Sequence, residues 1–166
     1  LFQRDAKRLL AYCSIEHIGI IAVGVGLGGI GTLAAMFHTL NHSVCKSVGF
    51  FGAGRLGQLY GSHDLDRMKG TLGASPLWGG ALLLSLLALI GVVPFAVFMS
   101  ELQIVKAAVD GGRTLPLTLF LLAAAIVFVG MFVHATSMAF GAAPSDVKKQ
   151  KASFLEYGLV AAPLLL

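Results

Sequence analysis

Three ionisable side chains follow one another along a single apolar stretch of the sequence. His38, His42 and Lys46 are spaced by four residues each, which places them on one face of a helix with a step of about 6 Å. Histidine exchanges protons near neutral pH, and a lysine held between helices releases its proton more readily than one in water. A single membrane histidine often serves only as a hydrogen-bond partner between helices. Three such groups on one stripe favour a proton relay.

A carboxylate, Glu101, stands seven residues after Pro94 in another apolar stretch. Proline removes a helix hydrogen bond and breaks or kinks the helix. Broken helices in membranes leave free backbone polar groups, and ion pathways commonly use them. We therefore expect Glu101 to be the acidic counterpart of the relay. The structural alternative is that Glu101 only pairs with Lys106 or lies near the membrane interface.

Two more ionisable residues, Glu16 and His17, lie in the first apolar stretch. Charged side chains at bilayer depth cost about 2.5–3.5 kcal/mol each on insertion scales, so their presence indicates function. We expect His17 to join the relay. His134 is isolated among apolar neighbours, and we expect it only to satisfy a neighbouring backbone carbonyl.

No metal or cofactor site is expected. Two histidines four residues apart can bind zinc, but His38 and His42 lack a third strong ligand nearby, and Lys46 would repel the cation. The two cysteines, Cys13 and Cys45, lack paired spacing, which disfavours a disulfide framework or a metal knuckle. Both are predicted to be packing residues.

Composition indicates an integral membrane protein. Apolar residues make up 57% of the chain without its 21 glycines, charged residues only 12%, and the mean hydropathy is +0.85. A soluble domain of 166 residues could not bury that much apolar surface. The net charge of +4 comes from short basic clusters between apolar runs, without aromatic interleaving. Nucleic-acid binding is therefore disfavoured.

A glycine-rich run resembles a nucleotide-binding signature. Residues 24–29 (GVGLGG) fit the G-x-G-x-x-G pattern, which alone is a weak signal. A dinucleotide site would also need an acidic residue about 20 positions further on, where this chain has an apolar span. The run is instead expected to form a turn.

Membrane-spanning helices of about 20 residues must position the relay residues. The apolar stretches predict four complete spans, at 9–25, 32–53, 76–109 and 115–143, and a truncated fifth that opens at Phe154. The third stretch would be about 50 Å long as one continuous helix. We therefore expect a single discontinuous span, broken around Pro94. The predicted fold class is an all-α membrane protein.

Basic residues assign the two sides of the membrane, because cytoplasmic loops carry an excess of lysine and arginine. With 76–109 as one span, one side receives only Arg113. The other side receives all the remaining loop cations: Arg4, Lys7, Arg8, Arg55, Arg67, Lys69, Lys148, Lys149 and Lys151. Dividing that stretch into two spans would spoil this asymmetry. The basic side is expected to be cytoplasmic, in a multi-pass protein of the inner (plasma) membrane.

The chain is expected to be a piece of a longer protein, cut at both ends, because it lacks an initiator methionine and ends in an apolar run. Its first residues are charged and lead directly into a long span, so no signal peptide is evident. Residues 1–166 are expected to form part of a single transmembrane domain.

These residues lie in runs that resemble a known family. Residues 5–19 (DAKRLLAYCSIEHIG) are similar to the D-x-K-R-x-x-A-Y-S-S-x-x-H-x-G signature of antiporter-like, proton-pumping membrane subunits. The likeness continues through the histidine and lysine stripe, the loop 63–70 (HDLDRMKG), and the run 91–95 (GVVPF) followed by Ser100 and Glu101. The family includes membrane-arm subunits of respiratory complex I, Mrp-type cation/proton antiporters and membrane subunits of energy-converting hydrogenases. Within it, the chain is most similar to the F component of hydrogenase-4.

The resemblance implies a whole protein with two inverted repeats, of which this piece covers most of the second. It implies that Lys46 and Glu101 match central proton-carrying positions, linked by His17, His38 and His42. The implied partners are other subunits of a hydrogenase or NADH dehydrogenase complex, which would carry any redox chemistry. The alternatives are a component of an Mrp-type sodium/proton antiporter and a purely structural membrane anchor.

Overall fold

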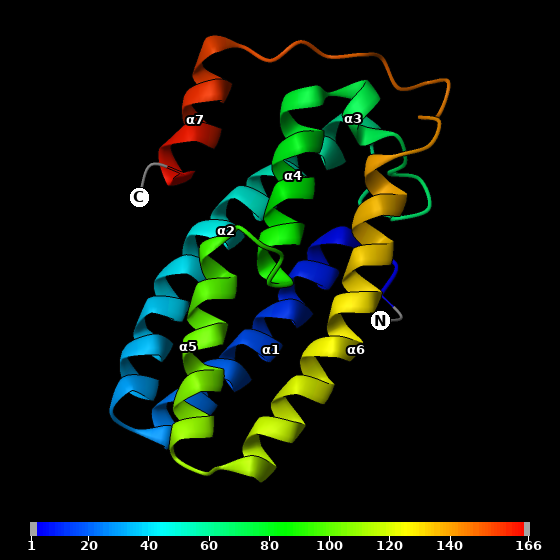
Figure 1. The fold of residues 1–166 in the computed structure, drawn as a ribbon. Coiled ribbons are helices and arrows are strands. Elements are labelled where there is room, and N and C mark those ends of the chain that lie inside the picture. Colours follow the sequence, from blue (N-terminus) through cyan, green and yellow to red (C-terminus); the bar gives the residue numbers. More distant parts are fainter. Residues whose placement is uncertain (1–2, 165–166) are drawn as a thin grey trace.

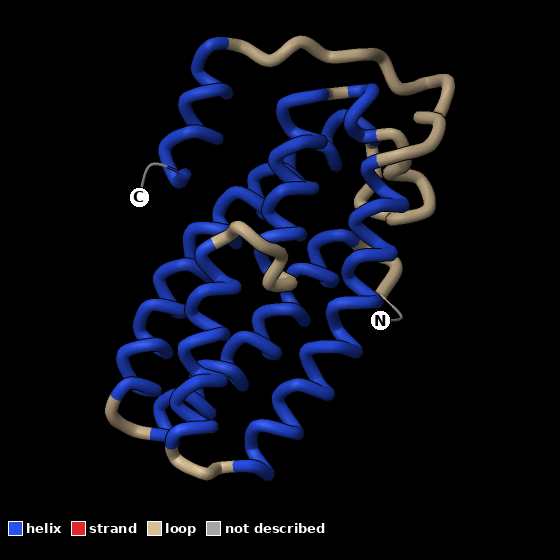
Figure 2. The backbone as a smooth tube through the Cα atoms, in the orientation of Figure 1, coloured by secondary structure: helices blue, strands red, loops and turns tan. Residues whose placement is uncertain are grey.

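The computed structural model describes residues 3–164, which contain helices and no β-strand (Figure 1). Figure 2 shows the same chain as helices joined by loops, with a long loop before the last helix. The helices are α1 (Ala6–Leu27), α2 (Ile30–Tyr60), α3 (Thr71–Ala74), α4 (Pro76–Leu89), α5 (Ala96–Asp110), α6 (Thr114–Ala139) and α7 (Phe154–Leu164).

α1 and α2 form an antiparallel hairpin (Figure 1). α1 begins after Asp5, whose carboxylate accepts a hydrogen bond from the Arg8 amide at 2.9 Å and so caps a helix end that lacks backbone partners. The hairpin turns at Gly28 and Gly29, whose φ angles of +73° and +50° suit glycine. The whole glycine-rich run was expected to turn, but its first two glycines lie inside α1.

α4 and α5 are the two halves of the stretch that was predicted to be discontinuous. They are separated at residues 90–95, where Gly91 has a φ of +70° and the peptide bond before Pro94 is cis. Pro94 has no amide hydrogen for a helix hydrogen bond, so the break lies where the sequence predicts it. The Asn41 side chain donates to the carbonyl of Ala96 at 3.0 Å. This contact ties α2 to the first turn of α5, directly after the break.

α2 is the central helix and packs against α1, α4 and α5. α6 contacts α4 and α5 and runs alongside α1 (Figure 1). α7 lies at the edge of the bundle, where it contacts α2 after the loop has crossed the end of the molecule. The site described below is therefore built between α2 and the helices that surround it.

Apolar packing forms two clusters with a polar layer between them. The larger cluster includes Leu10, Leu56, Met68 and Leu86, and the smaller consists of Ile20, Ala34, Ile104 and Phe120. The buried polar residues of α1, α2 and α5 are His17, His38, Lys46 and Ser100. Along α1, His17 lies between Cys13 of the larger cluster and Ile20 of the smaller one. Buried polar groups are costly unless they are hydrogen-bonded to one another.

In the described part of the chain, two helices, α1 and α6, are long and apolar enough to cross a membrane by length and composition. Only 11% of the apolar window of α6 is buried, and a large outward apolar surface of this kind marks a membrane or protein contact. The predicted range 32–53 is too short, because α2 continues to Tyr60. The short α3 was not predicted at all.

Candidate functional site

Three helices bring a hydrogen-bonded chain of side chains into the buried centre of the molecule. Nδ1 of His17 on α1 lies 2.8 Å from Nε2 of His38 on α2. Nδ1 of His38 lies 2.8 Å from Oγ of Ser100 on α5. All three residues have an exposed fraction of 0%. His38 is 21 residues from His17 and 62 from Ser100 in the sequence, so only helix packing brings the three together.

The hydrogen positions in this chain follow from its last member. The Ser100 hydroxyl donates to the Val97 carbonyl at 2.7 Å, so its oxygen must accept a hydrogen from Nδ1 of His38. Nε2 of a neutral His38 is then an acceptor, and it takes the hydrogen of Nδ1 of His17. Nε2 of His17 is left with a free lone pair. It is buried and makes no well-formed hydrogen bond among residues 3–164, although the Leu89 backbone lies near the ring.

A third imidazole, that of His42, lies against the ring of His17. The two ring centroids are 4.6 Å apart and the planes are tilted by 36°. Nε2 of His42 is also buried and finds no partner within the described part of the chain. Two unpartnered ring nitrogens therefore belong to neighbouring histidines, and each can accept a proton without breaking an existing hydrogen bond.

Glu101 lies beside this chain, next to the break between α4 and α5. One donor atom from each of His17, His38 and Glu101 lies within 4.8 Å of the others. The carboxylate faces Gly91, where a Cβ atom would come to 2.5 Å from Oε2 of Glu101. The glycine in the break thus leaves room for the carboxylate. Lys106, the expected structural partner of Glu101, pairs instead with Asp110.

Lys46 is engaged by α1 rather than by the two histidines of its own stripe. Its ammonium group donates to the Leu10 carbonyl, lies within hydrogen-bonding reach of the Cys13 thiol, and interacts electrostatically with Glu16. Lys46 is only 6% exposed. The four-residue spacing correctly places the three side chains on one face of α2. On α1, however, the two histidines of that face contact His17, whereas Lys46 contacts the Leu10 carbonyl and the Cys13 thiol.

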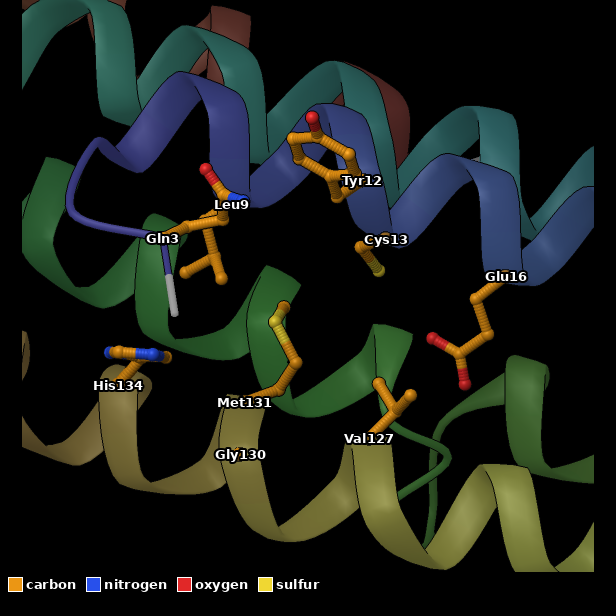
Figure 3. A pocket seen from close by; sticks show the side chains of 9 residues that line it. All are labelled: Gln3, Leu9, Tyr12, Cys13, Glu16, Val127, Gly130, Met131 and His134. Carbon is orange, nitrogen blue, oxygen red and sulfur yellow. The ribbon is translucent and has the colours of Figure 1, made fainter. Parts of the chain in front are cut away.

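Two residues of this site were not assigned a role from the sequence. Ser100 belongs to a motif in the sequence, but its partner His38 is 62 residues away, so local spacing cannot reveal the contact. Cys13 was predicted to be a packing residue, yet it lies beside the Lys46 ammonium. His134, which was expected only to satisfy a backbone carbonyl, lies on α6 and lines a cavity whose far end is Glu16 (Figure 3).

Among residues 3–164, two groups of side chains have donor atoms close enough together to hold a metal ion. One is His17, His38 and Glu101, and the other is Cys13, Glu16 and His17. In the first group both nitrogens of His38 are already hydrogen-bonded, which leaves too few free ligands for a structural metal site. The second group lies beside the Lys46 ammonium, which repels cations. Both groups suit proton exchange better than metal binding.

Comparison with known proteins identifies a matching family. The pattern described as "NADH:quinone oxidoreductase/Mrp antiporter, TM" matches residues 1–141. The chain is 38% identical over 107 residues to the hydrogenase-4 component F homolog of Methylacidiphilum infernorum (isolate V4), which covers 64% of this chain and 22% of the relative. It is 36% identical over 113 residues to hydrogenase-4 component B of Escherichia coli (strain K12), covering 61% and 17%.

Solved structures share the fold. A chain of respiratory complex I from Thermus thermophilus with bound NADH superposes with a TM-score of 0.85 at 25% identity, covering 98% of this chain and 34% of that chain. A chain of the Mrp complex from Dietzia sp. DQ12-45-1b superposes with a TM-score of 0.81 at 27% identity, covering 89% and 28%. The chain therefore spans well under half the length of the proteins it matches.

Proposed function

Because this chain belongs to the NADH:quinone oxidoreductase/Mrp antiporter membrane family, we propose that it is part of a proton-translocating membrane subunit in which buried histidine, lysine and glutamate side chains relay protons. The observation that carries the proposal is the buried chain from His17 through His38 to Ser100. Such a chain moves a proton by exchanging hydrogen bonds, and no group needs to travel.

Within the histidine chain, a proton enters at the free lone pair of His17. A proton that binds Nε2 makes His17 an imidazolium, which gives its Nδ1 hydrogen to Nε2 of His38. His38 in turn gives its Nδ1 hydrogen to Ser100, whose own hydroxyl hydrogen turns away from the Val97 carbonyl and passes through a water to the Glu101 carboxylate, which becomes a carboxylic acid. Glu101 lies within 4.8 Å of both rings, which a single bridging water can span. Glu101 is therefore the acceptor beside the helix break.

Lys46 and His42 complete the set of proton carriers. Lys46 is a buried cation with partners on α1, and a charge at that depth biases the protonation of every group around it. His42, against the ring of His17, offers a second acceptor. In this proposal Lys46 and Glu101 occupy the two ends, and His17, His38 and His42 link them.

The membrane arrangement belongs to the same proposal. The chain contributes four complete spans and the start of a fifth, with α4 and α5 as one discontinuous span and the basic loops on the cytoplasmic side of the inner (plasma) membrane. Residues 1–166 form most of the second repeat of a larger transmembrane domain. The partners are other subunits of a hydrogenase or NADH dehydrogenase complex, which supply the redox chemistry, so this chain needs no cofactor.

A second candidate is an antiporter component that exchanges a metal cation for protons. It is favoured by a 30% identity over 157 residues to a protein of Rhizobium meliloti (strain 1021) that is described as part of a probable K(+)/H(+) antiporter. Replacing sodium and potassium in the assay buffer by choline separates the proton relay from the antiporter. A subunit that moves only protons keeps its activity in choline, whereas an antiporter loses it. A purely structural anchor predicts that neutral substitutions at Lys46 and Glu101 leave coupling intact.

The deciding experiment measures proton translocation by the intact parent complex in sealed vesicles. Wild type is compared with Lys46→Ala and Glu101→Gln at equal amounts of assembled protein. We expect each variant to lower the initial rate by about a hundredfold, the usual contribution of a positioned acid or base. If both variants translocate protons at the wild-type rate, the relay is wrong and the chain is a structural anchor.

A further inference from the structure

A cavity of about 160 Å³ lies between α1 and α6, away from the histidine chain (Figure 3). Its lining includes the polar residues Gln3, Cys13, Glu16 and His134, whereas the Tyr12 hydroxyl points away from α6 (Figure 3). Figure 3 shows Gln3 and His134 at one end and the Glu16 carboxylate at the other, with Met131 and Val127 of α6 along one wall. A cavity of this size with several polar partners has room for a short file of water molecules.

The cavity continues to the charged end of the molecule. A neighbouring hollow shares Gln3 and His134 with it and extends to Arg4 and Asp66. In the other direction, a larger hollow shares Glu16 and is otherwise lined by apolar side chains of α1 and α6. Glu16 therefore stands at the inner end of the polar route, where the apolar part begins.

Glu16 also meets the relay. One donor atom from each of Cys13, Glu16 and His17 lies within 4.8 Å of the others. Nδ1 of His17 is engaged by His38, so Nε2, the nitrogen without a partner, is the one that can accept a proton from Glu16. Cys13 in turn contacts Lys46. Glu16, at the inner end of the cavity, thus lies close to His17, the first member of the histidine chain.

We propose that Glu16 is a further proton-carrying residue, which takes protons from water in the cavity between α1 and α6 and delivers them to His17. This inference rests on the proposed function and gives the relay its entrance. A hydronium ion protonates the Glu16 carboxylate and leaves water. The resulting carboxylic acid gives its proton to Nε2 of His17, directly or through one water. The carboxylate is restored, and the imidazolium donates onward to His38.

Glu16→Gln tests the proton-carrying role in the intact parent complex, in sealed vesicles. Glutamine keeps the shape and hydrogen-bonding capacity but cannot take up a proton, so we expect at least about a tenfold lower initial rate of proton translocation. Glu16→Asp keeps the acid and should recover part of the rate, which a merely structural role does not predict. Lys46→Ala and Glu101→Gln are measured in parallel.

The water route is tested through its own lining. Gly130 lines the cavity, so Gly130→Leu should fill it and slow translocation, whereas Ala125→Leu, on an exposed part of the same helix, should not. Cys13 lines the same cavity, and in a Cys45→Ala background it reports access. A charged methanethiosulfonate added on the basic side should modify Cys13, as detected by mass spectrometry of its peptide, and Gly130→Leu should abolish that modification.

The outcomes separate this inference from the proposed function. Wild-type rates in Glu16→Gln, together with lost translocation in Lys46→Ala and Glu101→Gln, overturn the role of Glu16 alone. Wild-type rates in all three variants overturn the relay itself. An unmodified Cys13, or equal effects of Gly130→Leu and Ala125→Leu, overturns the cavity as the route.

Discussion

Ser100 Oγ lies 2.8 Å from Nδ1 of His38, and this contact decides which nitrogen of the ring carries the hydrogen. The serine hydroxyl is already committed as a donor to the Val97 carbonyl, so it can only accept from the ring. A single hydroxyl on α5 thereby sets the direction of every hydrogen bond in the chain through His38 to His17.

Removing that hydroxyl should disable the relay while the fold survives. Ser100→Ala leaves the Nδ1 hydrogen of His38 buried without an acceptor, which costs about 1–3 kcal/mol and frees the ring to adopt the other tautomer. We expect slower proton translocation in vesicles and a lower melting temperature of the complex. Ser85→Ala is the matched control, because Ser85 is similarly buried but bonds only to the Cys45 carbonyl. Equal rates in the two variants would contradict the assigned role of Ser100.

A methyl group at Gly91 should displace the Glu101 carboxylate. The added Cβ would lie 2.5 Å from Oε2 of Glu101, in addition to the strain of a φ of +70°. Gly28→Ala provides the comparison, since Gly28 has a φ of +73° but no atoms near a new Cβ. Both variants should lose about 1 kcal/mol of stability from the backbone, and only Gly91→Ala should also slow translocation. The idea fails if Gly28→Ala slows it equally.

Close packing of α2 against α1 and α4 should depend on Gly49. A Cβ there would come to 2.5 Å from Ser85 Oγ and 3.2 Å from a Leu10 methyl group, so Gly49→Ala should destabilise the bundle by about 1–3 kcal/mol. Gly54, on the same helix, has open space around it. Gly54→Ala should be neutral or stabilising by up to about 1 kcal/mol. Thermal unfolding in detergent measures both, and equal melting temperatures would refute the packing role.

The attachment of α7 should depend on one carboxylate. Glu156 accepts hydrogen bonds from Arg55 of α2 at 2.8 Å and from the Trp78 indole of α4 at 3.0 Å. Glu156→Gln weakens the charged bond, so the amides of α7 should exchange hydrogen faster. Asp146→Asn removes an ion pair with Arg67 whose two side chains are 44% and 61% exposed, and exposed pairs contribute little. Unchanged exchange in Glu156→Gln would mean that the carboxylate does not hold α7.

The sequence predicted correctly those features that depend on residues near one another in the chain. Apolar runs predicted the long helices, Pro94 predicted the break between α4 and α5, and the motifs predicted a family that comparison confirms. The spacing of His38 and His42 placed both on the face of α2 that meets His17. These features depend on helix period and on backbone chemistry, which adjacent residues determine.

Contacts between side chains on different helices could not be predicted in this way. Nothing near His38 in the sequence indicates that Ser100 closes the chain, and nothing near Lys46 indicates that it reaches the Leu10 carbonyl rather than a histidine. Such contacts depend on how far each helix is rotated and shifted against its neighbours. The end of α2 was also missed, because the predicted span stops at Ala53 although the helix continues to Tyr60.

The burial of the His17 and His38 rings limits how soon the proposed relay can work again. After one proton has passed, each ring holds its hydrogen on the opposite nitrogen, and the chain cannot carry a second proton the same way until both rings turn over. Rings with no exposed surface turn only when the packing around them loosens. In the proposed relay, the dense centre of the bundle therefore admits a second proton only after the helices have moved enough for both rings to turn.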